Sequence, residues 1–238
     1  MVRQVRLGGI AVDVVFKDIK NVHLSVYPPT GRVRISAPSR MSLDTIRVFA
    51  ISKLAWIKQQ QKKLRAQERE TPREYLDRES HYVWGKRYLL RTVQCEKAPS
   101  VELKHSRMIL TVRGGVGLTT KEAVVGHWYR EQIKTLVPQL LSKWEPVLGV
   151  SVKRVFVQQM KTKWGSCNPH AYTIRLNTEL AKKPKECLEY IVVHELVHLL
   201  EPTHNARFMA LMDQYVPKWK FFRQQLNRLP VRHADWGF

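Results

Sequence analysis

The chain has 238 residues, 44% of them hydrophobic, which suffices for one large domain or two small ones with apolar cores. Lysine and arginine outnumber the acidic residues by 41 to 20, so we expect attraction to polyanions such as nucleic acid, nucleotides or acidic proteins. There is no run of eighteen apolar residues and no apolar leader, and the three cysteines are widely spaced, so we expect no membrane span, no secretory signal and a reducing, cytoplasmic location.

The N-terminal region has the β-branched content and turn residues of short strands. The predicted strands are residues 9–16, 22–27 and 32–36, with a hairpin turn at 28–31 between the last two. Ser42 then stands at the N-cap position of one helix, whose apolar positions run from Ile46 to Ile57. The charged residues 59–78 are predicted to be a linker or a solvated extension of this helix.

The rest of the chain mixes strand and helix patterns, which predicts an α+β fold. Strands are expected over residues 81–93, 101–112, 150–158 and 172–177, and helices over 120–144, 187–200, 206–215 and from about 217. Residues 229–238 are predicted to be a non-helical tail. We therefore expect a β-rich region with one helix over 1–115 and a second region over 116–238.

The sequence HELVH over residues 194–198 carries the strongest chemical signal. His194 and His198 are four residues apart, so on a helix both imidazoles lie on one face and can reach one metal ion. Glu195 is the residue type that accepts a proton from a metal-bound water. With His204 ten positions after the first histidine, the donors are three imidazoles with one open position, as in a catalytic zinc site. The sequence therefore predicts a hydrolase that binds one Zn²⁺ ion.

The chain must leave the helix soon after His198 if His204 is to return to the metal. In metzincin proteases a glycine stands three residues after the second histidine. Here Glu201 stands at that position, and Pro202 provides the break instead. Glu201 lies seven residues after His194 on the same helical face, so it stays an alternative third ligand or a partner of a ligand. We favour His204, because the turn at Pro202 directs the chain back toward the metal.

The segment before this helix, residues 160–168, is placed to line a cleft, and Trp164 is its central aromatic residue. The alternative is a structural hairpin in which Trp164 caps the core. Cys167 could be a further ligand, but we favour a small buried residue at this position. Zinc proteases bind substrate backbone by strand addition at an edge strand, for which residues 155–164 or 172–177 are candidates. The candidate substrate contacts are Lys161, Lys163, Trp164, Arg175, Asn177 and Arg207.

These segments, in this order, resemble the YgjP-like family of metal-dependent hydrolases, a zincin-like group. The resemblance is carried by residues 35–38, 56–57, 84–88, 161–167, 175–177 and 194–204, with Phe208 after them. It implies a zincin-like catalytic half preceded by a β-rich N-terminal half. It also implies zinc on His194, His198 and His204, with Glu195 catalytic. By its motif the family is similar to peptidases, and nucleotide phosphohydrolase activity has also been attributed to it, so the substrate stays open.

Three functions are compatible with these residues. The first is a metallopeptidase in which Glu195 takes a proton from water and returns it to the leaving amine. Candidates for its oxyanion donor, close in sequence only, are His170, Tyr172 and Arg207. The second is a hydrolase of nucleotide phosphoanhydrides, in which the basic candidate contacts hold phosphates. The third is a nucleic-acid-associated protein whose zinc site is secondary or acts on DNA-bound proteins.

Overall fold

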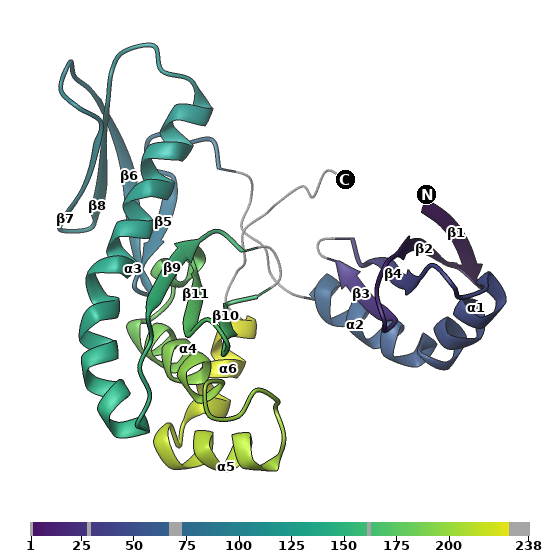
Figure 1. Ribbon diagram of the computed structural model, residues 1–238. Coiled ribbons are helices and arrows are strands. Elements are labelled where there is room, and N and C mark those ends of the chain that lie inside the picture. The colour runs from purple at the N-terminus through teal and green to yellow at the C-terminus, as the bar shows by residue number, and fades with distance from the viewer. Residues whose placement is uncertain (1, 28–29, 67–72, 161–162, 229–238) are drawn as a thin grey trace. The chain divides into compact units, whose positions relative to one another are not determined.

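The computed structural model describes residues 2–27, 30–66, 73–160 and 163–228 (Figure 1). The fold is mixed α+β and separates into two compact units, one within residues 1–72 and one of Arg73–Leu229. Each unit has its own hydrophobic core. The boundary that we expected after residue 115 falls inside the second unit instead. The strands before residue 115 and the helix after it share one core, so the chain does not divide there.

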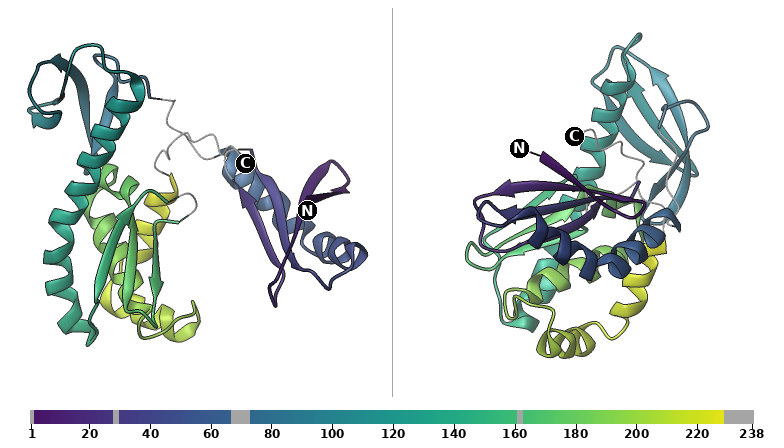
Figure 2. Two further views of the ribbon diagram at one scale, coloured as in Figure 1. Left: turned by 45° about the horizontal axis from the view of Figure 1, so that its top comes forward. Right: turned by 90° about the vertical axis from the view of Figure 1, so that its right-hand side faces the viewer.

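The first unit is a four-stranded sheet with two helices packed on one face (Figures 1 and 2). Its elements are β1 (Val2–Leu7), β2 (Ile10–Lys17), β3 (His23–Tyr27), β4 (Arg32–Pro38), α1 (Leu43–Ser52) and α2 (Leu54–Ala66). The strand order is β1-β2-β4-β3, with β2 and β4 parallel and the other neighbours antiparallel. The predicted hairpin is present as β3 and β4. Alternate residues of the central strands, such as Val12 and Ile35, are fully buried beneath the helices.

The helical part of this unit differs from the prediction in one respect. Ser42 caps α1 as expected, because its hydroxyl accepts a hydrogen bond from the backbone N–H of Thr45 at 3.2 Å. The single predicted helix is two, however, since Lys53 leaves helical geometry and its N–H turns back to the carbonyl of Ala50. Residues 67–72, within the predicted linker, lie outside the described residues.

A second four-stranded sheet opens the second unit. Its strands are β5 (Ser80–Val83), β6 (Lys86–Gln94), β7 (Ser100–Lys104) and β8 (Arg107–Val112), in the order β5-β6-β8-β7. The segment predicted as strand over 81–93 comprises β5 and β6, which a turn with positive φ at Trp84 and Gly85 separates. The strand predicted over 101–112 is a hairpin instead, because His105 adopts a left-handed conformation (φ 53°) and reverses the chain.

Helix α3 (Leu118–Leu148) is the longest element and runs along this unit (Figure 1). It buries Val125, Tyr129, Ile133 and Val137, which recur at every fourth position and therefore form one apolar stripe. The helix is longer than the predicted 120–144 and ends at Gly149, which supplies the left-handed C-terminal cap (φ 66°).

The elements around the predicted metal motif complete the unit. They are β9 (Arg154–Gln158), β10 (Gly165–Asn168), β11 (Thr173–Asn177), a short 3-10 helix (Thr178–Lys182), α4 (Lys185–Val197), α5 (Ala206–Tyr215) and α6 (Trp219–Arg228). The three strands form a sheet in the order β10-β11-β9. Helix α5 has the predicted bounds, whereas β10 lies between the predicted strands 150–158 and 172–177, where no separate strand was predicted. The predicted tail over 229–238 lies outside the described residues. None of the helices in the described part of the chain is long and apolar enough to cross a bilayer.

Candidate metal centre and cleft

Helix α4 carries two of the three predicted ligands. His194 lies in its last turn and His198 follows its last residue, with ring centroids 4.9 Å apart. Nine of the thirteen α4 residues are buried, so the helix is fixed by the core on most of its surface. The four-residue spacing therefore places both imidazoles on one rigid face.

The chain turns back directly after α4 and brings the third predicted ligand to the other two. The Glu201 N–H donates to the carbonyl of the last α4 residue at 2.9 Å, and the Asn205 side chain caps α5 by accepting from the Phe208 N–H at 3.0 Å. Between these two contacts, His204 has its Nε2 3.1 Å from Nε2 of His194. One ligand atom from each of the three histidines lies within 4.8 Å of the others.

Glu201 contacts a histidine of this cluster through its backbone. Its carbonyl oxygen lies 3.1 Å from Nδ1 of His198, so this nitrogen donates and Nε2 is left for a metal. The Glu201 carboxylate accepts a hydrogen bond from the Thr203 hydroxyl at 3.0 Å. Among the residues that the structure describes, the group able to hold a metal consists of the three histidines and includes neither Glu201 nor Cys167.

Phe208 forms an apolar floor beneath the three imidazoles. Its ring centroid lies 5.0 Å from that of His194 and 4.7 Å from those of His198 and His204. Phe208 is 1% exposed, so water does not reach the histidines from this side. Tyr190, one turn before His194, packs edge-on against its ring at 5.9 Å. An apolar shell of this kind controls solvent access to a metal site.

Burial keeps the α4 imidazoles neutral. Burial, followed by the charges of His198, His204 and Arg223, lowers the pKa of His194 to about 3, and burial also lowers the pKa of His198. Neutral imidazole is the form that binds a metal. Nδ1 of His194 is buried and has no hydrogen-bond partner among the described residues. This is not the ring nitrogen that faces the cluster. Nε2 of His194 lies 3.1 Å from Nε2 of His204, so the donor set itself, three imidazoles meeting at one place, fits a metal-binding role.

Glu195 is 4% exposed and lies directly against strand β10. A Cβ atom on Gly165 would lie 2.5 Å from Oε1 of Glu195, so only glycine leaves room for this carboxylate. Burial raises the pKa of Glu195 to about 8, and the charge of Lys163 opposes this shift. A carboxyl group with a pKa in this range can take up and release a proton near neutral pH.

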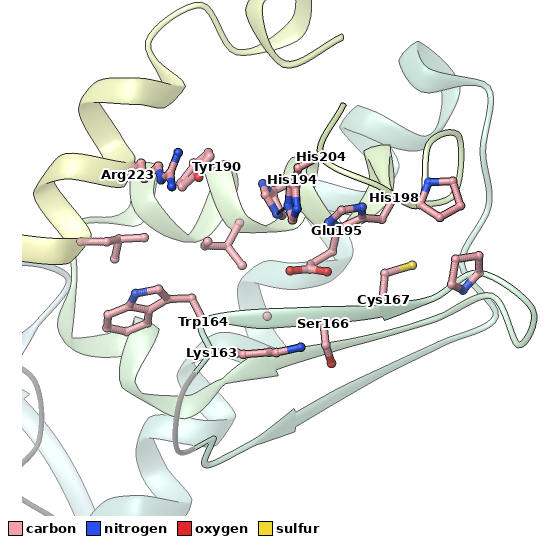
Figure 3. Close-up of a pocket in the computed structure, with 15 residues that line it drawn as sticks. Lys163, Trp164, Ser166, Cys167, Tyr190, His194, Glu195, His198, His204 and Arg223 are labelled. Atoms are coloured by element: carbon pink, nitrogen blue, oxygen red, sulfur yellow. Dashed lines mark hydrogen bonds between the residues drawn. The ribbon is translucent and has the colours of Figure 1, made fainter. Parts of the chain in front are cut away.

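A cleft of about 500 Å³ adjoins α4 and includes the three histidines and Glu195 in its wall (Figure 3). Arg223 and Tyr190 lie toward one end and Cys167 toward the other (Figure 3). The remaining lining residues come from β10 and the residues around it, from α4, from the turn after α4 and from α6. They are Lys163, Trp164, Gly165, Ser166, Cys167, Pro169, Tyr190, Ile191, Pro202, Arg223 and Leu226.

The structure brings two of the predicted substrate contacts into this cleft. Lys163 lines the cleft and is exposed there. Half-buried Trp164 lines the cleft and also packs against the core, so it has features of both predictions, a cleft residue and a residue that caps the core. Lys161 lies outside the described residues. His170 and Tyr172, the neighbouring candidates for an oxyanion donor, do not line the cleft.

Arg175 and Arg207 also lie outside the cleft lining. The Arg175 guanidinium lies 5.3 Å from the centre of the Phe156 ring on the neighbouring strand β9. Arg207 is exposed at the start of α5. Neither side chain lines this cleft, and their role as substrate contacts stays a prediction.

Asn177 has a structural role, because its buried side chain holds the segment that precedes β10. It is 5% exposed, and its Nδ2 donates to the carbonyls of Met160 and Lys163 at 2.9 and 2.8 Å. Its Oδ1 accepts from the N–H groups of Met160 and Glu179 at 3.3 and 3.1 Å. These bonds hold the chain on both sides of the undescribed residues 161–162, so Asn177 positions the residues leading into β10.

Strand β10 is an edge of the three-stranded sheet, and β11 lies in its centre. The alternative in which residues 172–177 form an edge is therefore wrong. The Asn177 N–H donates to the Trp164 carbonyl at 2.9 Å, so Trp164 and Asn177 form a hydrogen-bonded pair. Because hydrogen-bonded and non-hydrogen-bonded pairs alternate along antiparallel strands, Gly165 and Cys167 are in non-hydrogen-bonded pairs. Backbone groups of Gly165 and Cys167 then point away from β11, toward the open side of β10.

Sequence reasoning missed three residues of this site. Gly165 was noted only as part of the Trp164 segment, and its contact with Glu195 became visible only in the fold. Tyr190 lies four residues before His194, and this helical spacing is a signal from which its place on the same face could have been predicted. Arg223 is carried by α6, far away in sequence, and no local pattern indicated it.

The match of the chain to a family model agrees with the chemistry of this site. The chain matches the family model described as "YgjP-like, metallopeptidase domain" over residues 20–229. No curated protein sequence matches it significantly. Among solved structures it is similar to the metallopeptidase zymogens of Pyrococcus abyssi abylysin and Methanocaldococcus jannaschii jannalysin. The identities are 25% and 24% and the TM-scores 0.35 and 0.33, with 40% of this chain covered in each case and 99% and 92% of the other chains. Because the family model spans most of its length, the chain belongs to the YgjP-like family and contains its metallopeptidase domain.

Proposed function

We propose that this protein is a zinc-dependent peptidase whose ligands are His194, His198 and His204 and whose general base is Glu195. The observation that carries the proposal is the meeting of three imidazoles within 4.8 Å beside a buried carboxyl group in one cleft. Three histidines suit zinc, and they leave a coordination position for a reactant. Membership of a metallopeptidase family agrees with this assignment.

The side chain of Glu195 moves the proton in the proposed reaction. When bound, zinc supplies a Lewis acid that polarises a carbonyl group and makes water more acidic. A Glu195 carboxylate oxygen accepts the proton of the attacking water and later donates it to the nitrogen of the leaving amine. Gly165 lets the carboxylate lie at the strand, and the apolar floor of Phe208 excludes bulk water from beneath the histidines.

The peptide in this proposal lies alongside β10. Backbone N–H and C=O groups of Gly165 and Cys167 point to the open side of this edge strand. An extended peptide pairs with such groups as an added strand, which gives affinity without requiring a particular sequence. The same strand contacts Glu195 through Gly165, so pairing there keeps the peptide backbone close to the proposed base.

The test begins with metal analysis of the purified protein, followed by a quenched peptide library. We expect Glu195→Gln to retain zinc and to lower kcat by about 100- to 10,000-fold, because the general base is lost while the ligands remain. Glu186→Gln, at an exposed position on the same helix, is the matched control and should keep full activity. Undiminished hydrolysis by Glu195→Gln would remove this residue from the role of base.

The ligand set is tested separately. We expect His204→Ala to lose zinc and activity together, and chelator treatment of the unaltered protein to abolish activity until zinc is restored. His127→Ala, an exposed histidine of α3, controls for loss of an imidazole elsewhere. Normal zinc content in His204→Ala would point to Glu201 as the third ligand.

A nucleotide phosphohydrolase is the second candidate, since the exposed cations Lys163 and Arg223 line the cleft and could hold phosphate groups. The same pair of proteins, unaltered and Glu195→Gln, is therefore assayed on nucleoside triphosphates. Glutamate-dependent release of pyrophosphate or phosphate, without peptide cleavage, would favour this candidate over the peptidase.

A further inference from the structure

The cleft has an uneven balance of charge. Its charged lining residues are Lys163, Arg223 and Glu195, apart from the histidines. Both cations are exposed, whereas Glu195 is buried at the base of the cleft. Within the described residues neither Lys163 nor Arg223 forms an ion pair with a carboxylate, so both charges are directed to solvent or to a bound molecule. A divalent cation on the three histidines adds to this positive potential.

The two cations come from separate elements that are each held in place. The backbone of Lys163 is fixed by the Asn177 side chain, which donates to its carbonyl at 2.8 Å. Arg223 lies on α6, with its guanidinium 6.0 Å from the centre of the Trp219 ring. Trp219 is 5% exposed and is itself anchored, because its indole N–H donates to Asp213 at 2.7 Å. The fold therefore sets the backbone positions from which both charged side chains extend into the cleft.

Part of the cleft wall is apolar. Tyr190, Ile191 and Leu226 are 4%, 5% and 1% exposed, and half-buried Trp164 lines the same wall. Apolar walls have a low dielectric constant, so the field of nearby charges is screened less than at an open surface. The surface offers contacts to an apolar side chain together with two cations for a neighbouring anion.

We propose that Lys163 and Arg223 make the cleft selective for acidic peptide segments, in which aspartate or glutamate stands next to a bulky apolar residue close to the cleaved bond. This rests on the proposed peptidase function and adds the substrate class to it. A basic segment is disfavoured in the same cleft, because its charges meet Lys163, Arg223 and the metal ion without an exposed carboxylate to balance them.

The first experiment compares peptides of one sequence in which a residue flanking an apolar side chain is Glu, Gln or Lys. With the zinc-loaded full chain we expect kcat/KM to fall in the order Glu, Gln, Lys, chiefly through KM, and the difference to shrink as salt is added. Lys163→Gln and Arg223→Gln should each reduce the preference for Glu over Gln by about three- to tenfold.

Matched controls separate this role from general loss of charge or of folding. Lys218→Gln and Arg113→Gln remove exposed cations of the same unit that do not line the cleft, and they should keep the preference. Arg223→Lys keeps the positive charge and should therefore retain most of the preference for Glu over Gln. Thermal unfolding and zinc content of each variant show whether the fold is intact.

A binding measurement keeps the two proposals distinguishable. Fluorescence anisotropy with zinc-loaded Glu195→Gln reports binding of the Glu, Gln and Lys peptides without cleavage. Equal binding and equal kcat/KM for the three peptides would overturn the selectivity while leaving the peptidase function intact. Tight, salt-sensitive binding of the acidic peptide, with no peptide cleaved by the unaltered protein, would support the selectivity and overturn the peptidase function.

Discussion

Gly165 is the residue on which the position of Glu195 depends most directly. A methyl group there would lie 2.5 Å from Oε1 and 2.9 Å from Cδ of Glu195, well inside van der Waals contact. The carboxylate has to move, and it has little room because it is buried. We expect Gly165→Ala to retain zinc and to lower kcat by at least about tenfold, since a small misplacement of a catalytic group is costly.

The matched control is Gly126→Ala on α3. A Cβ at Gly126 meets nothing within 4 Å, and replacing glycine inside a helix by alanine stabilises it by about 0.5–1 kcal/mol. This variant should therefore be as active as the unaltered protein and unfold at a slightly higher temperature. If Gly165→Ala were also fully active, the close contact between Gly165 on β10 and the Glu195 carboxylate would not be needed for activity.

Cys187 provides a pH prediction away from the metal ligands. Burial raises the pKa of its thiol to about 11, with the Glu186 charge adding to the shift and the Lys183 charge opposing it. The folded protein thus holds this proton more tightly than the unfolded chain. The contribution of the protonated Cys187 thiol to the stability of the folded protein is therefore fully present below the unfolded pKa of about 9. This contribution declines as the pH rises toward the folded pKa of about 11.

At pH 8 we therefore expect Cys187 to react with a thiol reagent at least about tenfold more slowly than half-buried Cys95, as followed by mass spectrometry. In denaturant the two cysteines should react alike. Stability measured from pH 8.5 to 10.5 should fall less steeply in Cys187→Ala than in the unaltered chain. Equal labelling of the two cysteines in the folded protein would contradict the burial of this thiol.

At the scale of elements, the segment leading into β10 depends on a single side chain. Asn177 makes four hydrogen bonds, to Met160, Lys163 and Glu179, from a buried position on β11. We expect Asn177→Ala to lower the free energy of unfolding by about 2–4 kcal/mol, because buried backbone groups lose their partners. Activity should fall further than stability accounts for, since Lys163 and Trp164 are displaced.

Asn168→Ala is the control for this prediction. Asn168 is exposed at the end of β10 and accepts one hydrogen bond, from the Ala171 N–H at 3.1 Å. Its loss should cost less than about 1 kcal/mol, as measured by urea unfolding. Similar losses of stability in the two variants would show that the segment before β10 is held by other contacts.

At this scale the sequence predicted helices better than strands. The α5 bounds were correct, and the apolar stripe of α3 was recognised, because helical periodicity repeats many times within one element. The sequence pattern does not mark strand β10, and over residues 101–112 it predicts one strand where the structure has β7 and β8. Short strands contain few repeats of their pattern, and the turn at His105 has neither glycine nor proline to mark it.

At the scale of the whole molecule, the two units have separate cores and different shares of the charge. Residues 1–66 contain 13 lysines and arginines but only three acids, Asp13, Asp18 and Asp44. Asp13 is largely buried and paired with Arg32 at 2.5 Å. Nucleic-acid binding through the basic surface of the chain stays a prediction, and this unit, with its large excess of cations, is where we test it first.

We expect the full chain to bind DNA or RNA oligonucleotides at 50 mM salt and to lose about tenfold or more of its affinity at 200 mM, with or without zinc. Replacing Arg47, Lys58 and Lys62 by glutamine should weaken binding, measured by anisotropy. The same change at Lys104, Arg113 and Lys218 removes equal charge from the second unit and should weaken it less. Binding that does not depend on salt would exclude a phosphate-contacting surface.

The sequence by itself determined the candidate ligands and base, because their spacing of one helical turn is a local property that any α-helix converts into a shared face. It also determined the family, through motifs in a specific order. The tertiary structure decided which other residues reach the cleft. Gly165 and Arg223 belong to β10 and α6, which approach α4 only when the core forms. Arg175, Asn177 and Arg207 are close in sequence to the site but do not line the cleft. The division of the chain after residue 72 rather than 115 has the same cause, since shared burial between β5–β8 and α3 is a long-range property that no local pattern contains.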